Sequence, residues 1–595
     1  MKRPSIPFAE TLKNFLPLKP FFIQNRWPLV LGLISLIVVD FLQLLIPLVI
    51  KKAVDLLTTD AANARALLQL GGTIVVIALL IVCFRYMWRL LILGHSVRVE
   101  EGLRNRLYDH LQTLSPLFYQ RTKTGDIMAR SINDITAVRM AAGMGLVALI
   151  DGTVLGIAAV GFMLSINIKL TLLALIPAPL VVIFTRILTR RISLGFETVQ
   201  KTFSDLTERV REAFAGIRVI KAYNRESWEC DMVEDTGGKY VAVNMDLAKN
   251  LAVFFPMMAG FTNFGLAIVI WLGGSLTIYG NITMGDFVAF TAYLNLLTWP
   301  MMAMGWVTSL MQRASASLRR INHILEEKPD IKDPIESLTT SNILIKGGIR
   351  IKGLSIMQPG KKDYRLKDIY LSVRAGETVA VAGGVGSGKT TLLHTIPRLL
   401  DVPPDTLFID GHDICKIPLK KLRENIGFVT QEPFIFSDTI RNNVLFGRSG
   451  VSPKDLEAAL HAAGILEEAE AFEYGLDTVL GERGITLSGG QRQRLTIARA
   501  LIVDPPILIL DDALSMVDTR TEENILNRIM EMRHKKTSLI VSHRIATITR
   551  ANRIFVLERG ELLEQGSHDA LMAREGIYAG LYRRQQLARE LGDGS

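Results

Sequence analysis

Long apolar runs alternate with polar stretches in the first half of the chain. A helix that crosses a membrane needs about 20 mostly apolar residues, because about 30 Å of hydrocarbon is spanned at about 1.5 Å per residue. The polar stretches after the second and fourth runs carry charges at helical spacing and are predicted to continue the helices into the cytosol. Six runs meet the length requirement, at roughly 28–50, 70–94, 140–163, 168–189, 251–279 and 286–311.

The pattern changes after roughly residue 312 to that of a soluble α/β protein, with short apolar strands such as Thr378–Ala382 and Ile507–Leu510. Strands that alternate with helical patterns predict a largely parallel sheet. The predicted domains are an N-terminal amphipathic segment at 1–27, a transmembrane domain at 28–320, a linker at 321–341 and a soluble domain at 342–595.

The charge of the chain follows its membrane topology. The 595 residues carry a formal net charge of +10, and 49% of them are hydrophobic. A nucleic-acid-binding protein would concentrate Lys and Arg on one soluble domain, so no nucleic-acid partner is expected. Basic membrane flanks are typical of the cytoplasmic side, which predicts a multi-pass protein of the cell (inner) membrane with both termini and the soluble domain cytoplasmic. The basic flanks are Arg98–Arg106, Arg186–Arg191 and Arg313–Arg320.

Ionisable residues also fall inside or near the predicted spans. Charges at membrane depth are costly and tend to face a bundle interior or a wet cavity. One interpretation is a substrate cavity lined by two acids, which would favour cationic cargo. The other, which is preferred, is pairing between helices or placement near an interface. The residues concerned are Asp40, Asp151, Arg85, Arg89 and Arg186.

The first motif of the soluble domain that predicts a chemical function is a phosphate-binding loop. The loop follows an apolar strand and precedes the helical pattern Thr391–Leu400, which is the context that such a loop requires. Glycines let backbone N–H groups approach phosphate oxygens, and the helix N-terminus favours an anion. Lys389 is expected to hold the β- and γ-phosphates and Thr390 to place its hydroxyl on Mg²⁺. The predicted ATP-binding residues of this loop are Gly383, Gly384, Val385, Gly386, Ser387, Gly388, Lys389, Thr390 and Thr391.

Two acids end a second apolar strand, Ile507–Leu510. An acid at a strand end is suited to hold Mg²⁺, and a neighbouring acid is suited to polarise the attacking water. Next to a phosphate-binding loop, Asp511 is therefore predicted as a metal ligand and Asp512 as the catalytic base.

A third motif, Leu487-Ser488-Gly489-Gly490-Gln491, stands between the loop and the acids and precedes a helical pattern. Together with the loop it resembles the ATP-binding cassette (ABC) superfamily. Six spans followed by one cassette is similar to a type IV, multidrug-type half-exporter along essentially the whole chain. The fold class that this implies is an all-α six-helix transmembrane domain fused to a cytosolic α/β P-loop ABC ATPase domain. Further matching segments are Val429–Pro433 with Gln431, Gly481–Gly484, Ser515–Asp518 and Val541–Arg544 with His543.

The resemblance implies a head-to-tail dimer that holds two ATP molecules between its cassettes. Residues Leu487–Gln491 of each chain would complete the partner's site, with Ser488 and the backbone at Gly490 facing the partner's γ-phosphate. Gln431 would sense Mg²⁺ and the attacking water, and His543 would contact the γ-phosphate. The segments Phe118–Asp126 and Gly216–Tyr223 resemble the regions that couple cassettes to membrane helices.

Two positions depart from the family pattern. The family usually has Glu where this chain has Asp512, and shortening a base by one methylene misplaces its oxygens on the ~1 Å scale that costs about 10²-fold in rate. The aromatic residue that stacks on adenine aligns with Gln358, with Tyr364 as a candidate substitute. The first departure resembles the weak-site subunit of heterodimeric multidrug exporters, whose partner chain carries the Glu.

The leading hypothesis is therefore a subunit of an exporter for hydrophobic or amphipathic compounds, drugs or lipids, that works with a related half-transporter and uses ATP and Mg²⁺. A homodimeric lipid or lipopolysaccharide-precursor flippase is the first alternative. An ATP-gated channel or a nucleotide-binding membrane regulator is the second. The sequence does not name the cargo.

Overall fold

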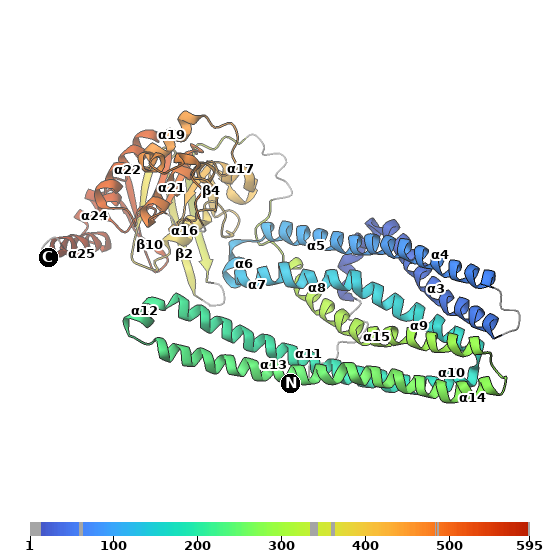
Figure 1. Ribbon diagram of the computed structural model, residues 1–595. Coiled ribbons are helices and arrows are strands. Elements are labelled where there is room, and N and C mark those ends of the chain that lie inside the picture. The colour runs from blue at the N-terminus through green and yellow to red at the C-terminus, as the bar shows by residue number, and fades with distance from the viewer. Residues whose placement is uncertain are drawn as a thin grey trace. The chain divides into compact units, whose positions relative to one another are not determined.

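The computed structural model of the chain describes residues 13–58, 64–333, 343–358, 363–481, 484 and 487–592. The chain divides into two compact units. The membrane unit comprises Met1–Thr113 and Thr122–Glu327, and the nucleotide unit comprises Leu114–Arg121 and Lys328–Ser595. Figure 1 shows the long helices of the first unit and the mixed sheets and helices of the second.

The membrane unit is entirely helical in its described residues, with short 3-10 and π-helical turns between longer α-helices. Its elements are η1 (Leu16–Leu18), α2 (Lys19–Gln24), α3 (Arg26–Leu57), α4 (Ala64–Trp88), η2 (Arg89–Leu93), α5 (Gly94–Thr113), α7 (Thr124–Ala129), η3 (Arg130–Asp134), α8 (Ile135–Met140), η4 (Ala141–Gly145), α9 (Leu146–Ile166), α10 (Ile168–Ala174), α11 (Pro177–Ala215), α12 (Ile217–Ala222), α13 (Glu226–Ile268), η5 (Val269–Gly273), α14 (Gly274–Ile278) and α15 (Met284–Leu325).

Five continuous helical segments are long and apolar enough to cross a membrane, within the part of the chain that the structure describes. A shorter apolar helix, Asn263–Ile278, falls inside the fifth predicted span at 251–279, which stays a prediction. The five segments are Arg26–Leu57, Ala64–Thr113, Thr124–Ile166, Ile168–Ala215 and Met284–Leu325.

Short polar residues and prolines set the helix boundaries. Asn167 separates α9 from α10, and its side-chain oxygen accepts a hydrogen bond from the backbone N–H of Leu170 at 3.0 Å, which caps α10. A turn at Leu175 and Ile176 then separates α10 from α11, and Pro177, which has no N–H to donate, takes the first position of α11. The run predicted as one span at 168–189 is thus two helices. Thr283 begins α15 through a reciprocal cap with Asp286.

Two long helices, α11 and α13, run side by side, and α12 lies between them at one end of the pair (Figure 1). Elsewhere in the membrane unit, helices are locked together by aromatic contacts. The buried Tyr293 of α15 stacks on Phe162 of α9, with ring centroids 5.5 Å apart, and donates its hydroxyl to the Leu44 carbonyl of α3 at 2.9 Å. A buried hydroxyl keeps its hydrogen bond in this way at no cost to packing.

The nucleotide unit contains two sheets. The four-stranded sheet has the order β2-β1-β4-β5 with antiparallel pairs, and the six-stranded sheet has the order β10-β9-β3-β8-β7-β6. In the larger sheet β9, β3, β8, β7 and β6 are parallel, and β10 is antiparallel at one edge. The strands are β1 (Ile349–Met357), β2 (Tyr364–Val373), β3 (Thr378–Ala382), β4 (Leu407–Ile409), β5 (His412–Asp413), β6 (Ile426–Val429), β7 (Ile507–Asp511), β8 (Thr537–Val541), β9 (Arg553–Glu558) and β10 (Glu561–Gly566).

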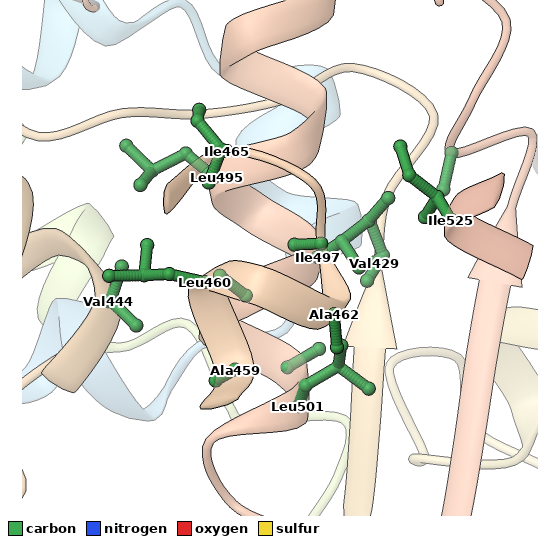
Figure 2. Packing of buried hydrophobic residues seen from close by; sticks show 14 of the residues in the cluster. Val429, Val444, Ala459, Leu460, Ala462, Ile465, Leu495, Ile497, Leu501 and Ile525 are labelled. Carbon is green, nitrogen blue, oxygen red and sulfur yellow. The ribbon is translucent and has the colours of Figure 1, made fainter. Parts of the chain in front are cut away.

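Helices cover these sheets and extend into a helical region around α21. Leu495, Ile497 and Leu501 of α21 pack with Leu460 of α19 and Val429 of β6 in one fully apolar cluster (Figure 2). The helices of the unit are α6 (Pro116–Arg121), α16 (Lys389–Thr395), η7 (Ile414–Lys416), α17 (Leu419–Glu424), α18 (Ile440–Leu445), α19 (Pro453–Ala462), α20 (Leu466–Glu470), η8 (Gly475–Asp477), α21 (Gly489–Leu501), α22 (Thr519–Met532), α23 (Ile545–Ile548), α24 (His568–Ala573) and α25 (Ile577–Gly592).

The segment Leu114–Arg121 belongs to this unit although it lies between α5 and α7 in the sequence. The Ser115 hydroxyl donates to Asp330 at 2.6 Å, and Leu117 lines the same cavity of about 510 Å³ as Ile356. The segment overlaps the first predicted coupling region, Phe118–Asp126.

Candidate functional site

The phosphate-binding loop joins β3 to α16 through backbone that only glycine adopts without strain. Gly383 has φ +149°, and a Cβ there would stand 2.2 Å from the Leu557 carbonyl oxygen. Gly388 has φ +100°, and a Cβ there would stand 2.9 Å from the Arg365 carbonyl oxygen of β2. The helix ends at Thr395, earlier than the predicted Leu400, because Pro397 has no N–H with which to continue the helical hydrogen bonds.

Lys389 is folded back onto the loop. Its Nζ donates to the carbonyls of Gly383 at 2.9 Å and Gly384 at 2.8 Å, and the residue is only 7% exposed. Burial lowers the pKa of this ammonium group, while the carboxylates of Asp511 and Asp512 act in the opposite direction. The two carbonyls are the only groups that the ammonium group donates to among the described residues, and a phosphate oxygen could replace them as acceptor.

A buried hydroxyl in the same loop tests whether a phosphate fits. The Oγ of Ser387 is buried and has no hydrogen-bond partner among the described residues. An unpaired buried donor costs about 1–3 kcal/mol, and a phosphate oxygen would satisfy it. The residues of the loop therefore fit a nucleotide phosphate.

Asp511 ends β7 directly beside the loop. It is 1% exposed, its side chain is hydrogen-bonded to Thr390, and its Oδ2 has no partner among the described residues. Burial raises the pKa of this carboxyl group, and the bond from Thr390 opposes the rise. An orphaned carboxylate oxygen next to a hydroxyl is a fitting donor set for Mg²⁺, which keeps most of its shell as water and phosphate oxygens.

Asp512 adopts a left-handed backbone, φ +48°, directly after the strand. Its own N–H donates to the Val541 carbonyl at 2.9 Å, and its Oδ1 accepts from the backbone N–H of His543 at 3.4 Å. The carboxylate is 8% exposed and is thus drawn toward the loop that follows β8.

Strand order brings the other predicted residues to the same edge of the sheet. The loop follows β3, His543 follows β8, the two acids end β7, and Gln431 follows β6, and these four strands are consecutive neighbours. Ligands of open α/β sheets bind outside the carboxyl ends of the strands. Gln431 and His543 are exposed there.

The predicted adenine-contacting residues lie at the two ends of the β1–β2 turn. Gln358 donates its N–H to the Asp363 carbonyl at 2.9 Å, and Tyr364 begins β2 with its ring exposed. Tyr364 stands next to Arg365, whose carbonyl lies 2.9 Å from where a Cβ of Gly388 would be. Tyr364 thus begins the strand that contacts the phosphate-binding loop, and its role toward adenine stays a prediction.

The Leu487–Gln491 motif forms the start of α21. Ser488 is the N-cap, with its Oγ accepting from the N–H of Gln491 at 3.2 Å and its own N–H donating to Gln491 Oε1 at 2.8 Å. Gln491 also donates to Glu468 at 2.8 Å, and Leu487 is buried in the helical core. Gly489 and Gly490 let this helix end approach Met516, since a Cβ on Gly489 would stand 2.8 Å from its sulfur.

Comparisons with known proteins match both units of the chain. A family model described as "ABC transporter transmembrane region" matches residues 29–301, and one described as "ABC transporter" matches residues 366–515. The chain is 35% identical over 97% of its length to a probable multidrug resistance ABC transporter ATP-binding/permease protein, YheI, of Bacillus subtilis, and covers 98% of that relative. The chain belongs to the ABC transporter family.

Two further matches specify the type of ABC transporter. The chain is 32% identical to an ATP-dependent lipid A-core flippase of Syntrophus aciditrophicus, covering 94% of this chain and 93% of that one. A solved bacterial Atm1-family ABC exporter with ATP bound matches with a TM-score of 0.76 and 25% identity, over 94% of this chain and 98% of that chain. This ABC transporter is therefore a half-exporter, a helical transmembrane domain fused to an ATPase domain with α/β sheets, which confirms the predicted fold class and the predicted ATP-driven activity.

One residue of this half-exporter that sequence reasoning missed is Gln493 of α21. It is fully buried, its Nε2 donates to Ser515 Oγ at 3.0 Å, and its Oε1 accepts from the N–H of Met516 at 2.8 Å. These two hydrogen bonds hold the loop after Asp512 against α21, the helix that Ser488 caps. A glutamine between two arginines in an amphipathic helix is the only sequence signal of this role.

A second missed residue is Glu522 of α22, which is 3% exposed. Its carboxylate accepts hydrogen bonds from Arg544 and from the Thr547 hydroxyl. These bonds hold the loop that carries His543. The sequence gives no signal for them, because the partners lie more than 20 residues away on another element.

Proposed function

We propose that this chain is one subunit of an ATP-driven exporter that moves hydrophobic or amphipathic compounds, drugs or lipids, out of the cytoplasm or the inner leaflet. The ATPase domain and both termini would lie in the cytoplasm and the helices in the cell (inner) membrane, in keeping with the basic flanks of the spans. The proposed partner is a related half-transporter with Glu at the position of Asp512.

The observation that supports a partner half-transporter with its own Glu is the hydrogen bond from the backbone N–H of His543 to Asp512 Oδ1. A base that is one methylene short and turned toward a neighbouring loop is displaced on the ~1 Å scale that costs about 10²-fold. The site formed by this chain's own loop and acids would therefore bind ATP and turn over slowly. The intact Ser488 and Gly490 would serve the partner's faster site.

Each residue of the proposed weak site would have its own role in binding phosphate, Mg²⁺ or water. Lys389 would leave the Gly383 and Gly384 carbonyls for the phosphates, and the backbone N–H groups of the loop would bind phosphate oxygens. Thr390 and Asp511, with Gln431, would hold Mg²⁺, which neutralises charge on the phosphate oxygens. His543 would contact the γ-phosphate, and Asp512 would orient water as a slow base.

Binding of ATP is proposed to drive the transport cycle through differential stability. Two cassettes that sandwich ATP between the loop of one chain and the Leu487–Gln491 motif of the other stabilise one state of the membrane helices, and hydrolysis removes that preference. The regions Phe118–Asp126 and Gly216–Tyr223 are proposed to transmit the change.

Purification of the tagged chain from its native membrane tests this proposal. A copurifying half-transporter with Glu at the corresponding position is expected, and the pair should hydrolyse ATP at least tenfold faster than this chain alone. Changing the partner's Glu to Gln should remove most of that activity, whereas Asp512→Asn in this chain should remove little. A chain that forms a fast homomeric ATPase and transports by itself would contradict the pairing.

A homodimeric lipid flippase is the second candidate, favoured by the 32% identity to a lipid A-core flippase. It predicts that the chain alone, reconstituted in vesicles, moves fluorescent lipid between leaflets on addition of ATP and Mg²⁺. An ATP-gated channel or regulator, the third candidate, would instead show flux only down a gradient.

A further inference from the structure

Asp40 lies near the middle of α3 in the membrane unit. It is 0% exposed, and neither of its carboxylate oxygens has a hydrogen-bond partner in the described residues. An isolated carboxylate in such a place is among the most costly groups that a protein can bury. Its presence calls for a positive charge or a proton beside it.

The group that acts on Asp40 from α9 is a second acid, Asp151, and two carboxyl groups can form a hydrogen bond with one another only when one of them carries a proton. The Trp299 indole of α15 donates its N–H to Asp151 Oδ2 at 2.7 Å and fixes that carboxylate in place. Two facing carboxylates in a low dielectric do not both stay ionised; they share a proton or hold a cation. The pair is thus incomplete without a positive ligand.

Positive side chains on the neighbouring helices offset part of the negative charge of Asp40 and Asp151. Arg85 of α4 is the opposite charge that acts on Asp40, while Arg89 of η2 lies over the Trp88 ring at 5.7 Å. With one shared proton, Asp40, Asp151 and Arg85 carry no net charge. If an organic cation replaces the proton, the net charge of the three side chains with their ligand stays at zero. The exchange therefore adds little to the free-energy cost of holding charge at membrane depth.

The surroundings of Asp151 suit an organic cation better than a metal ion. The Trp299 ring is 52% exposed and Asp151 is half-buried, so an aromatic face and a carboxylate lie together on the open side of the pair. This combination binds alkylated or aromatic cations through cation–π attraction and charge. No cluster of three metal-ligating side chains occurs among the described residues.

We propose that Asp40 and Asp151 form a proton-for-cation exchange site: the two carboxyl groups share one proton when the site is empty, and release it to solvent when the positive group of an amphipathic cation binds. This inference rests on the proposed export function and names the class of cargo. Binding would occur before any ATP is hydrolysed, so the site is testable apart from the transport cycle.

The test is binding of tetraphenylphosphonium to the full-length protein in lipid nanodiscs, without nucleotide, in weakly buffered solution with a pH indicator. The expected result is release of up to one proton per cation bound and an apparent affinity that rises with pH. The neutral analogue triphenylphosphine oxide should release none. Asp40→Asn and Asp151→Asn should each abolish proton release and weaken tetraphenylphosphonium binding at least tenfold.

Asp246→Asn, which removes an exposed carboxylate of α13 that forms an ion pair with Lys249, is the matched control and should behave as wild type. Asp40→Glu keeps the carboxyl group and should retain proton release if Asp40→Asn fails to fold. Release that persists in both Asn variants, or no tetraphenylphosphonium binding by wild type, would overturn the site. Either result leaves the exporter proposal intact if the ATPase and transport measurements succeed, so the two failures are distinguishable.

Discussion

The carboxylate of Asp512 accepts a hydrogen bond from the backbone N–H of His543, with 3.4 Å between oxygen and nitrogen. The bond joins the loop after β7 to the loop after β8. The same Asp512 holds a left-handed backbone whose N–H is bound to Val541. The Asp512 side chain is therefore held by the backbone at His543, and a change at Asp512 should shift the loop that carries the histidine.

Replacing Asp512 with Glu should raise hydrolysis at this chain's own site by about 10- to 100-fold, because the added methylene restores the reach toward the phosphate site. The measurement is single-turnover hydrolysis of labelled ATP, with any partner's Glu changed to Gln so that only this site reacts. An unchanged rate would mean that the bond to His543, and not side-chain length, limits the base.

Ser488→Ala should cost about 1 kcal/mol of local stability through loss of the helix cap and should also slow ATP turnover in the dimer. The matched control is Ser452→Ala, which removes an equivalent cap on α19, where the Ser452 hydroxyl accepts from the Asp455 N–H at 3.2 Å. Thermal unfolding should shift alike in both variants, with ATPase activity lost only in the first. Equal ATPase in the two would argue against a role of Ser488 toward a partner.

Gln493→Leu should free the loop at Ser515 and Met516. The change removes both hydrogen bonds of the Gln493 amide, and each buried group left unpaired costs about 1–3 kcal/mol, so amide hydrogen exchange at 513–517 should accelerate roughly tenfold or more. A double-mutant cycle with Ser515→Ala tests the contact itself, and a coupling free energy near 1 kcal/mol is expected. Additive effects of the two changes would contradict this contact.

Nucleotide affinity should fall at alkaline pH earlier than an ordinary lysine would allow. Burial lowers the pKa of Lys389 from its usual 10.5, and only the protonated form attracts phosphate. The favourable charge is therefore present below the lowered pKa and lost as the pH rises through it, and binding in that range should take up a proton. Titration of a fluorescent ATP analogue between pH 7 and 10.5 measures this, and a constant affinity over that range would refute it.

Local signals carried most of the sequence-based prediction. Glycines at a strand end followed by Lys389 define a loop because few other residues permit such backbone, and Ser488 with Gln491 marks a helix start by its cap. What could not be predicted depends on contacts between distant segments. The left-handed turn at Asp512 and the two bonds of Gln493 to the loop at Ser515 and Met516 arise from packing and backbone competition that no single stretch of sequence displays.

The hydrogen bond between Ser115 and Asp330 bears on how ATPase domains can be exchanged between half-transporters. Residues Leu114–Arg121 are separated from the rest of the nucleotide unit by some two hundred positions of sequence, yet fold as part of it. In a chimera joined only at the linker, Leu114–Arg121 would come from one half-transporter and the rest of the nucleotide unit from the other. Engineers who graft one half-transporter's ATPase onto another's helices should transplant both pieces together, and natural recombination at the linker faces the same barrier.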